Sequence, residues 1–164
     1  MTTGAAITFE ELLAWSDEAA LKWKSHIEAN PAVLELPCSI NRTATVQGLV
    51  RHIWGVELRW GGRLTGLPES EFPEGPLDAL FAMHVAAMGL YRTLLAEPAA
   101  RWDDTYVLKA DWLPVEKRTV SRRKVAAHSL LHSQRHYAQL ATLVREAGYP
   151  LGSEGDLLLS AALF

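Results

Sequence analysis

The sequence has little cysteine, no recognisable leader and no long apolar run. Its one cysteine, Cys38, cannot form a disulfide within the chain, which favours a reducing compartment. The first residues, MTTGAAITFEE, lack the basic region and apolar core of a secretory signal. The longest nearly unbroken apolar stretch, 157–164, is far shorter than the roughly 20 residues that cross a bilayer. We therefore expect a cytoplasmic protein with no membrane partner.

An excess of positive charge is also missing. The 164 residues carry 16 Lys and Arg against 19 Asp and Glu, a net charge of −3, which disfavours a nucleic-acid partner. The basic run KRTVSRRK at 117–124 straddles a predicted helix start, so we interpret it as a solvated segment or, at most, a patch for an anionic thiol cofactor. With 49% apolar residues, the chain is long enough for one well-packed domain, predicted to span residues 1–164.

Apolar residues recur at helical spacing in four long stretches. The first begins after Thr8, where Glu11 completes a capping box, and it ends at the helix-breaking pair Asn30-Pro31. Capping residues and stop signals predict that the other three run from Thr43 or Thr45 to Gly66, from 77 to 95, and from Thr119 or Ser121 to Ala147. Together they predict an all-α, up-and-down or crossover four-helix bundle.

The segments between these helices differ in character. Residues 31–44 have no clear period, and we interpret them as a connection that crosses from one end of the bundle to the other. Residues 67–76 are a turn-rich link, and 101–120 favour a short hairpin or extended excursion with a turn at Ala110-Asp111. The apolar tail, 151–164, is expected to dock on the bundle as a short helix or strand.

The six histidines are the most informative residues. In the sequence HSLLHSQRH, His128, His132 and His136 follow one another at four-residue steps on the last predicted helix. Residues four apart share a helix face, so two neighbouring imidazoles can converge on one metal ion. Eight residues span about 12 Å along a helix, so the outer two cannot reach the same ion. The pair is therefore 128/132 or 132/136.

A metal site needs a further ligand from a facing helix. His52 is the best candidate, because Gly48, Gly55 and Val56 would leave space beside its ring. His84 is an alternative, although a histidine within an apolar stripe is more often a hydrogen-bonded core residue. His26 is interpreted as a surface residue. No Glu lies between the paired histidines, which excludes a zinc protease of the HExxH type.

Other residues have both a functional and a structural interpretation. Glu57 or Gln139 could orient a ligand ring, but each is more often solvated. The aromatic residues Trp54, Trp60 and Tyr137 could line a pocket, although core or interface packing is the commoner role. No His or Lys adjoins Cys38, so it is interpreted as a small buried residue rather than a nucleophile.

Two segments resemble signatures of the DinB/YfiT-like family. LVRHIWGVELRW is similar to the family's helix with a central histidine, which is His52 here, and LLHSQRHYAQLATLVREAGYP resembles its second signature. In that second signature a His, three residues, a second His, a Gln-Leu pair, an Arg and a Gly follow in order, at His132, His136, Gln139, Leu140, Arg145 and Gly148. This chain departs from many members after the second histidine, where it has Tyr137 and Ala138 instead of Arg and Gly.

The resemblance implies a four-helix bundle, often a homodimer, that holds one divalent ion, Zn or Ni. The implied ligands are His52, His132 and His136, which leaves His128 as the bystander. Characterised members of the family include thiol-dependent S-transferases and maleylpyruvate isomerases that use low-molecular-weight thiols, while others have no assigned activity.

Three neutral imidazoles leave the charge of the ion uncompensated, as in catalytic zinc sites. Such an ion lowers the pKa of bound water and deprotonates a bound thiol, while ligand preference alone does not separate Zn from Ni. The leading prediction is a metal-dependent thiol S-transferase acting on a small electrophile. The alternatives are a non-catalytic stress protein that binds a metal or small ligand, and a metal-dependent hydrolase. No catalytic or cofactor-binding residue is assigned from the sequence.

Overall fold

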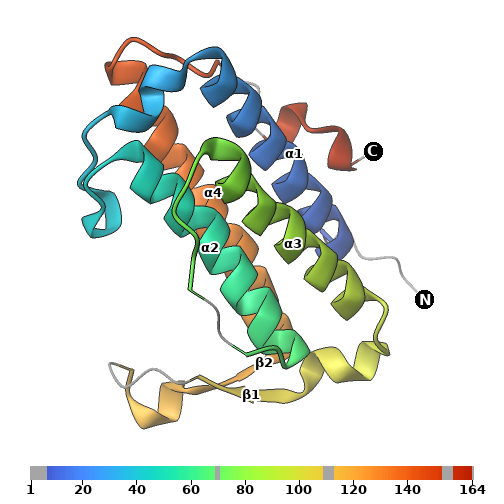
Figure 1. The fold of residues 1–164 in the computed structure, drawn as a ribbon. Helices are drawn as coiled ribbons and strands as arrows, with labels where there is room; N and C mark the ends of the chain where they lie inside the picture. Colours follow the sequence, from blue (N-terminus) through green and yellow to red (C-terminus); the bar gives the residue numbers. More distant parts are fainter. Residues whose placement is uncertain (1–6, 69–70, 109–112, 153–156, 164) are drawn as a thin grey trace.

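The computed structural model describes residues 7–68, 71–108, 113–152 and 157–163. Four long helices pack together (Figure 1): α1 (Phe9–Ala29), α2 (Val46–Thr65), α3 (Leu77–Leu95) and α4 (Arg122–Glu146). A short antiparallel hairpin of β1 (Thr105–Val107) and β2 (Thr119–Ser121) precedes α4. The predicted fold class, an all-α four-helix bundle with an extended excursion before the last helix, is confirmed.

The helices begin and end where local chemistry favours it. At the start of α1 the Thr8 amide donates to Glu11 Oε2 at 2.7 Å, and the Glu11 amide donates to Thr8 Oγ1 at 3.1 Å. At the starts of α2 and α4, the side chains of Thr45 and Ser121 accept the amides of Gly48 and Lys124. The C-cap of α2 is Gly66, whose φ of 79° is in the left-handed region that a side chain disfavours. The predicted helix boundaries are therefore correct to within a few residues.

Thr8→Ala is expected to lower the free energy of unfolding by about 1 kcal/mol, because the capping box loses the oxygen that accepts the Glu11 amide. Chemical denaturation of the two proteins measures this loss. Thr142→Ala is a suitable control, since its exposed hydroxyl bonds only to the Ala138 carbonyl of its own helix. Equal losses in the two variants would show that the box contributes nothing beyond an ordinary surface threonine.

The long crossover of the bundle is the link after α2. Figure 1 shows the segment 31–45 staying at one end of the bundle, whereas the chain after α2 runs back along its length before α3 begins. Arg51, near the start of α2, accordingly donates to the carbonyls of Phe72 and Pro73. Helices α2 and α3 are therefore parallel. The expectation that 31–44 crosses the bundle was wrong, because its short 3₁₀ turns only lead from the end of α1 to the neighbouring start of α2.

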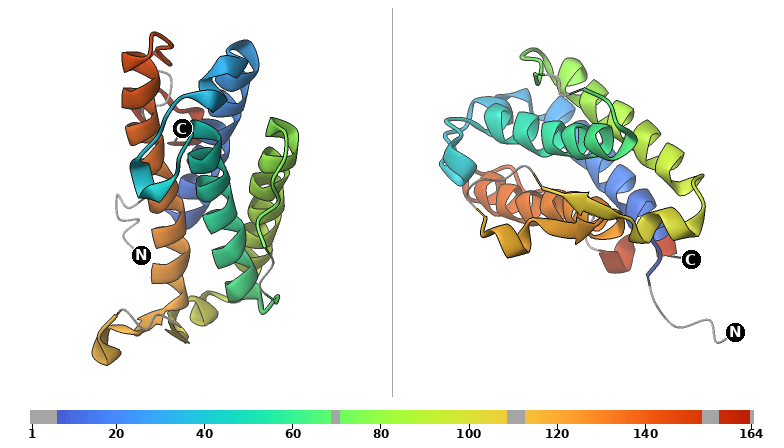
Figure 2. Two further views of the ribbon diagram at one scale, coloured as in Figure 1. Left: turned by 60° about the vertical axis from the view of Figure 1, so that its left-hand side comes forward. Right: turned by 90° about the horizontal axis from the view of Figure 1, so that it is seen from below.

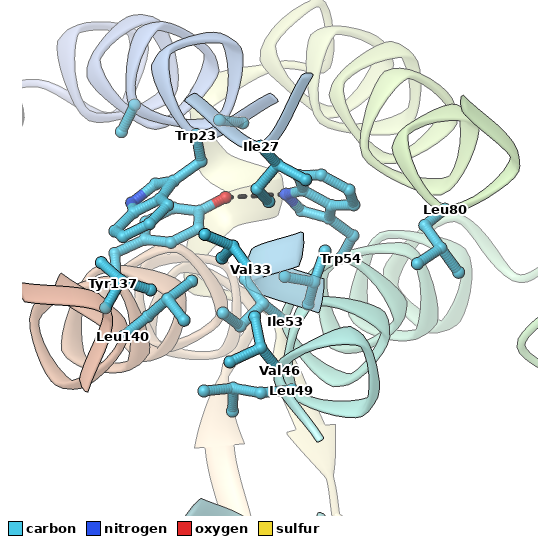
Figure 3. Close-up of a cluster of buried hydrophobic side chains, with 14 of the residues drawn as sticks. Trp23, Ile27, Val33, Val46, Leu49, Ile53, Trp54, Leu80, Tyr137 and Leu140 are labelled. Atoms are coloured by element: carbon cyan, nitrogen blue, oxygen red, sulfur yellow. Dashed lines mark hydrogen bonds between the residues drawn. The ribbon is translucent and has the colours of Figure 1, made fainter. Parts of the chain in front are cut away.

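The core has two clusters of buried apolar side chains, and the larger one lies between the four helices at the end where 31–45 closes the bundle (Figure 3). Trp23 of α1 stacks on Tyr137 of α4 with ring centroids 6.0 Å apart, and the Trp54 indole donates to the Tyr137 hydroxyl at 2.7 Å. Trp54 and Tyr137 are thus core residues, as the commoner interpretation predicts. Cys38 is also buried, and it accepts a hydrogen bond from Thr43.

Ion pairs tie the basic segment before α4 to the rest of the bundle. Arg122 pairs with Glu97 and also donates to the Leu64 carbonyl, while Arg123 pairs with Asp103. Both arginines begin α4, so these bonds join the start of α4 to the end of α2 and to the segment after α3. The exposed side chain of Arg123 agrees with the interpretation of 117–124 as a solvated segment, whereas that of Arg122 is largely buried. The turn predicted at Ala110-Asp111 lies outside the described residues.

The C-terminal segment forms two short 3₁₀ turns, Leu157–Leu159 and Ala161–Leu163, and the second of them packs on α1. The Ser160 hydroxyl donates to Glu18 of α1 at 2.6 Å. Figure 2 shows this segment and the hairpin from two further sides. Within the described residues, none of the helices is both long and apolar enough to span a membrane.

Candidate metal centre

Three histidines from two antiparallel helices meet beside the core. His52 lies in the first half of α2, and His132 and His136 lie one turn apart on α4. The His52 ring centroid is 5.1 Å from both other rings, and those of His132 and His136 are 4.5 Å apart. One ligand nitrogen from each ring lies within 4.8 Å of the other two. The structure thus brings together the three residues that the sequence singled out, and their role as ligands remains a prediction.

The spacing of the nitrogens fits a shared ion. His132 Nε2 and His136 Nε2 are 3.2 Å apart. Two nitrogens bound to one ion at about 2.0–2.1 Å with tetrahedral angles would be separated by roughly 3.4 Å. His52 Nε2, which faces the same cluster, is buried without a hydrogen-bond partner among the described residues. A buried imidazole nitrogen without a partner is costly unless something else binds it, so the donor set suits a divalent cation.

The three rings are held in the neutral form that can bind a metal. Burial, together with the neighbouring His136, lowers the pKa of His52 to about 4. Burial and the two neighbouring imidazoles lower the pKa of His132 to about 3. Burial also lowers the pKa of His136. Because a protonated imidazole has no free lone pair, this environment presents ligands rather than cations at neutral pH.

Gln139 and Arg135 bond to the ring of His136. The Nδ1 atom of His136 lies 2.7 Å from Gln139 Oε1, an amide oxygen that can only accept. Nδ1 therefore carries the proton, and the Nε2 lone pair faces His132. The Arg135 guanidinium lies 3.3 Å from that Nε2. Of the two residues proposed to orient a ligand, Gln139 does contact one.

Glu57 does not orient a ligand ring. It is fully buried between α1, α2 and α3, where its Oε2 lies 2.7 Å from His84 Nδ1. His84 Nε2 lies 3.1 Å from Asp17 Oδ1, so His84 lies outside the three-histidine cluster and has two carboxylate partners. Both Glu57 and His52 are on inward-facing parts of α2. The helical period alone therefore cannot predict that Glu57 contacts His84 whereas His52 lies in the histidine cluster.

The space expected beside His52 is filled. A Cβ on Gly55 would lie 2.4 Å from Phe72 Cδ2, so the missing side chain admits the Phe72 ring from the crossover link. A Cβ on Gly48 would similarly lie 3.2 Å from Thr43 Cβ. The expectation that these glycines leave room for an ion and its ligand was wrong. The ion's place would instead be on the α4 side of His52, where the other two histidines lie.

The remaining histidines are peripheral to the cluster. His128 is exposed, and its ring centroid lies 5.9 Å from that of His132 and 6.5 Å from that of Trp60. His128 is not part of the three-residue group, as expected of a bystander. His26 was expected at the surface but is half-buried, with its ring edge against Trp23 at 5.8 Å.

Two arginines near the cluster were not anticipated. Arg135 directly precedes His136 in HSQRH and lies against its ring. Its position next to a candidate ligand could have indicated this contact from the sequence. The Arg59 guanidinium packs over the Phe72 ring, 4.4 Å from the ring centroid. Its charge helps to lower the pKa of His52. The contact between Arg59 and Phe72 could not be predicted from sequence spacing, because Phe72 belongs to the crossover link rather than to α2.

One family model matches this chain. The model of the DinB family matches residues 1–154, which is most of the chain. Neither a curated protein nor a solved structure matches the chain.

Proposed function

The chain belongs to the DinB family, and we propose that it is a metal-dependent transferase that joins a small external thiol to a small electrophile. The observation that supports this proposal is the convergence of three neutral imidazoles, each with a ligand nitrogen within 4.8 Å of the others. His52, His132 and His136 would hold one divalent ion, zinc or nickel. The ion would supply a positive charge that lowers the pKa of a bound thiol into the neutral range.

The chain's own residues would hold and orient this site. The three rings offer neutral nitrogens at neutral pH, and Gln139 keeps the proton of His136 on Nδ1. The hydrogen bonds of the three rings to described residues run only to Arg135, Gln139 and one another. The chemistry of the site is therefore that of a cation without a carboxylate ligand.

Two features favour external thiol transfer over the other reactions. Cys38 is buried, accepts a hydrogen bond from Thr43 and is not part of the three-histidine group, so the reacting thiol would have to come from outside. Hydrolysis of esters or amides commonly uses a carboxylate as general base, and no carboxylate among the described residues bonds to these rings. A thiol that is already deprotonated needs no such base.

Turnover assays test the proposal. Zinc- or nickel-loaded protein is incubated with a low-molecular-weight thiol and a bimane, and formation of the thioether is followed by fluorescence. We expect conjugation that depends on metal and disappears with a chelator. Metal-independent conjugation, or hydrolysis of a generic ester without conjugation, would contradict the proposal. Stoichiometric metal without either reaction would favour a binding protein instead.

Gln139→Ala is expected to weaken zinc binding by about 10–100-fold, because His136 loses the acceptor that fixes its tautomer and ring orientation. Competition with a chromophoric chelator measures the affinity. Gln139→Glu, which retains an acceptor at the same place, should preserve binding. Thr142→Ala, an exposed position one turn further along α4, is the matched control. An affinity in Gln139→Ala equal to that of the control would mean that Gln139 does not orient the ligand.

A further inference from the structure

The charged groups nearest the cluster are all cationic. Arg135 lies 3.3 Å from His136 Nε2, and its charge lowers the pKa values of His52, His132 and His136. Arg59 acts on His52 in the same direction. No carboxylate of the described chain acts on these three rings in the opposite direction. In a protein whose net charge is −3, this is a local concentration of positive charge.

These guanidiniums are also free of structural ion pairs. Arg51, Arg92, Arg101, Arg122 and Arg123 each pair with a carboxylate. Among the residues that the structure describes, no such pair includes Arg59 or Arg135. Arg59 rests on Phe72, and Arg135 donates only to the weak acceptor Nε2 of His136. Both side chains are exposed, so their donors are open to an anion supplied from outside.

The bond between Arg135 and His136 strengthens this argument. The His136 Nε2 lone pair can serve either the guanidinium or a metal ion, because the proton of that ring is held on Nδ1 by Gln139. Occupation of the cluster by a cation would therefore release the donors of Arg135 beside the site. A cation and a guanidinium would then lie next to one another, and an anionic group would stabilise both.

We propose that the site selects substrates that carry an anionic oxygen group, a carboxylate or a phosphate, which Arg135 binds while the reacting group lies at the three histidines. This inference deepens the proposed function and rests on it. Arg135 is the primary partner because it contacts the cluster directly. Arg59, held against Phe72, contributes through its charge. The preferred thiol or electrophile is accordingly an acid rather than a neutral molecule or an amine.

Binding of small thiols of different charge tests the proposal without turnover. The protein is loaded with Co²⁺, and mercaptoacetate, 2-mercaptoethanol and cysteamine are titrated against its visible absorption. We expect mercaptoacetate to bind about tenfold more tightly than 2-mercaptoethanol, and cysteamine to bind most weakly. Arg135→Gln should remove the advantage of mercaptoacetate. Arg145→Gln, an exposed position further along α4, should keep it. An unchanged preference in Arg135→Gln would overturn the assignment.

A second titration separates this inference from the thiol chemistry. Acetate, methyl phosphate and acetamide are added to the protein as purified, and the NMR signals of the histidine rings are followed. We expect the two anions to shift these signals at lower concentrations than acetamide, with the difference lost in Arg135→Gln. The stronger of the two anions identifies the preferred group. If no thiol binds but this difference persists, the thiol function fails and the anion site stands. Equal responses to the anions and acetamide would overturn the anion site.

Discussion

His132→Ala is expected to abolish stoichiometric metal binding. His132 lies close to both other candidates, with its ring centroid 5.1 Å from that of His52 and 4.5 Å from that of His136. Structural zinc sites gain about 10–16 kcal/mol from roughly four ligands, so one ligand accounts for about 3 kcal/mol. Its loss should weaken binding at least roughly a hundredfold. Two histidines on different helices would remain, too few to hold the ion through purification.

Metal analysis of the purified variants measures this effect. His128→Ala is the matched control, because it also removes an imidazole from α4 but from an exposed position outside the cluster. Circular dichroism establishes that both variants fold. Stoichiometric metal in folded His132→Ala would refute the three-histidine site. An equal loss of metal in His128→Ala would instead indicate the other pair on α4, His128 with His132.

Local signals predicted much of the fold. The capping box at Thr8, the cap at Ser121 and the glycine after α2 act within one or two turns, so the sequence contains all of their partners. The path of the links depends on tertiary packing instead. The sequences of 31–44 and 67–76 do not indicate which link runs the length of the bundle. The crossover was therefore predicted at 31–44, whereas the structure has it after α2.

The candidate site could be predicted only in part, namely the part that depends on local helix geometry. Two histidines one turn apart share a face whatever else the chain does, so the pair on α4 follows from helix geometry. Spacing alone left His128 and His136 as alternatives, and the family resemblance selected His136. The partners of Glu57, Gly55 and Arg59 come from other elements, through His84 and Phe72. Contacts between residues from different elements leave no periodic pattern in the sequence, so they could not be predicted from it.

The second large effect concerns the polar network buried between α1, α2 and α3. His84, fully buried on α3, bonds to Glu57 of α2 at 2.7 Å and to Asp17 of α1 at 3.1 Å. Arg92 donates to the other oxygen of Asp17 at 3.0 Å, and Ser16 donates to Glu57 at 3.4 Å. Burial alone would lower the pKa of His84, but the two carboxylates outweigh it and raise the pKa to about 9. The network is therefore a charged cluster that joins three helices.

Glu57→Ala is expected to lower the free energy of unfolding by about 3–5 kcal/mol, because it leaves the buried imidazolium with Asp17 alone and creates a cavity. Glu146→Ala, an exposed carboxylate at the end of α4, should change it by less than about 0.5 kcal/mol. Urea denaturation at pH 7 compares the two. A loss in Glu57→Ala as small as in the control would show that the cluster adds nothing to stability.

The same network should make stability depend on pH above neutrality. The pKa of His84 is raised from 6.5 to about 9 in the folded protein, so folding favours the protonated ring. This contribution, about 3 kcal/mol, is fully present below pH 6.5 and declines as the pH rises through 9. Urea denaturation between pH 6 and about 9.5 should therefore show a falling free energy of unfolding, and His84→Gln should flatten that fall. A wild-type profile as flat as that of the variant would mean that His84 is neutral, and that the two carboxylates are held by Arg92 and Ser16 instead.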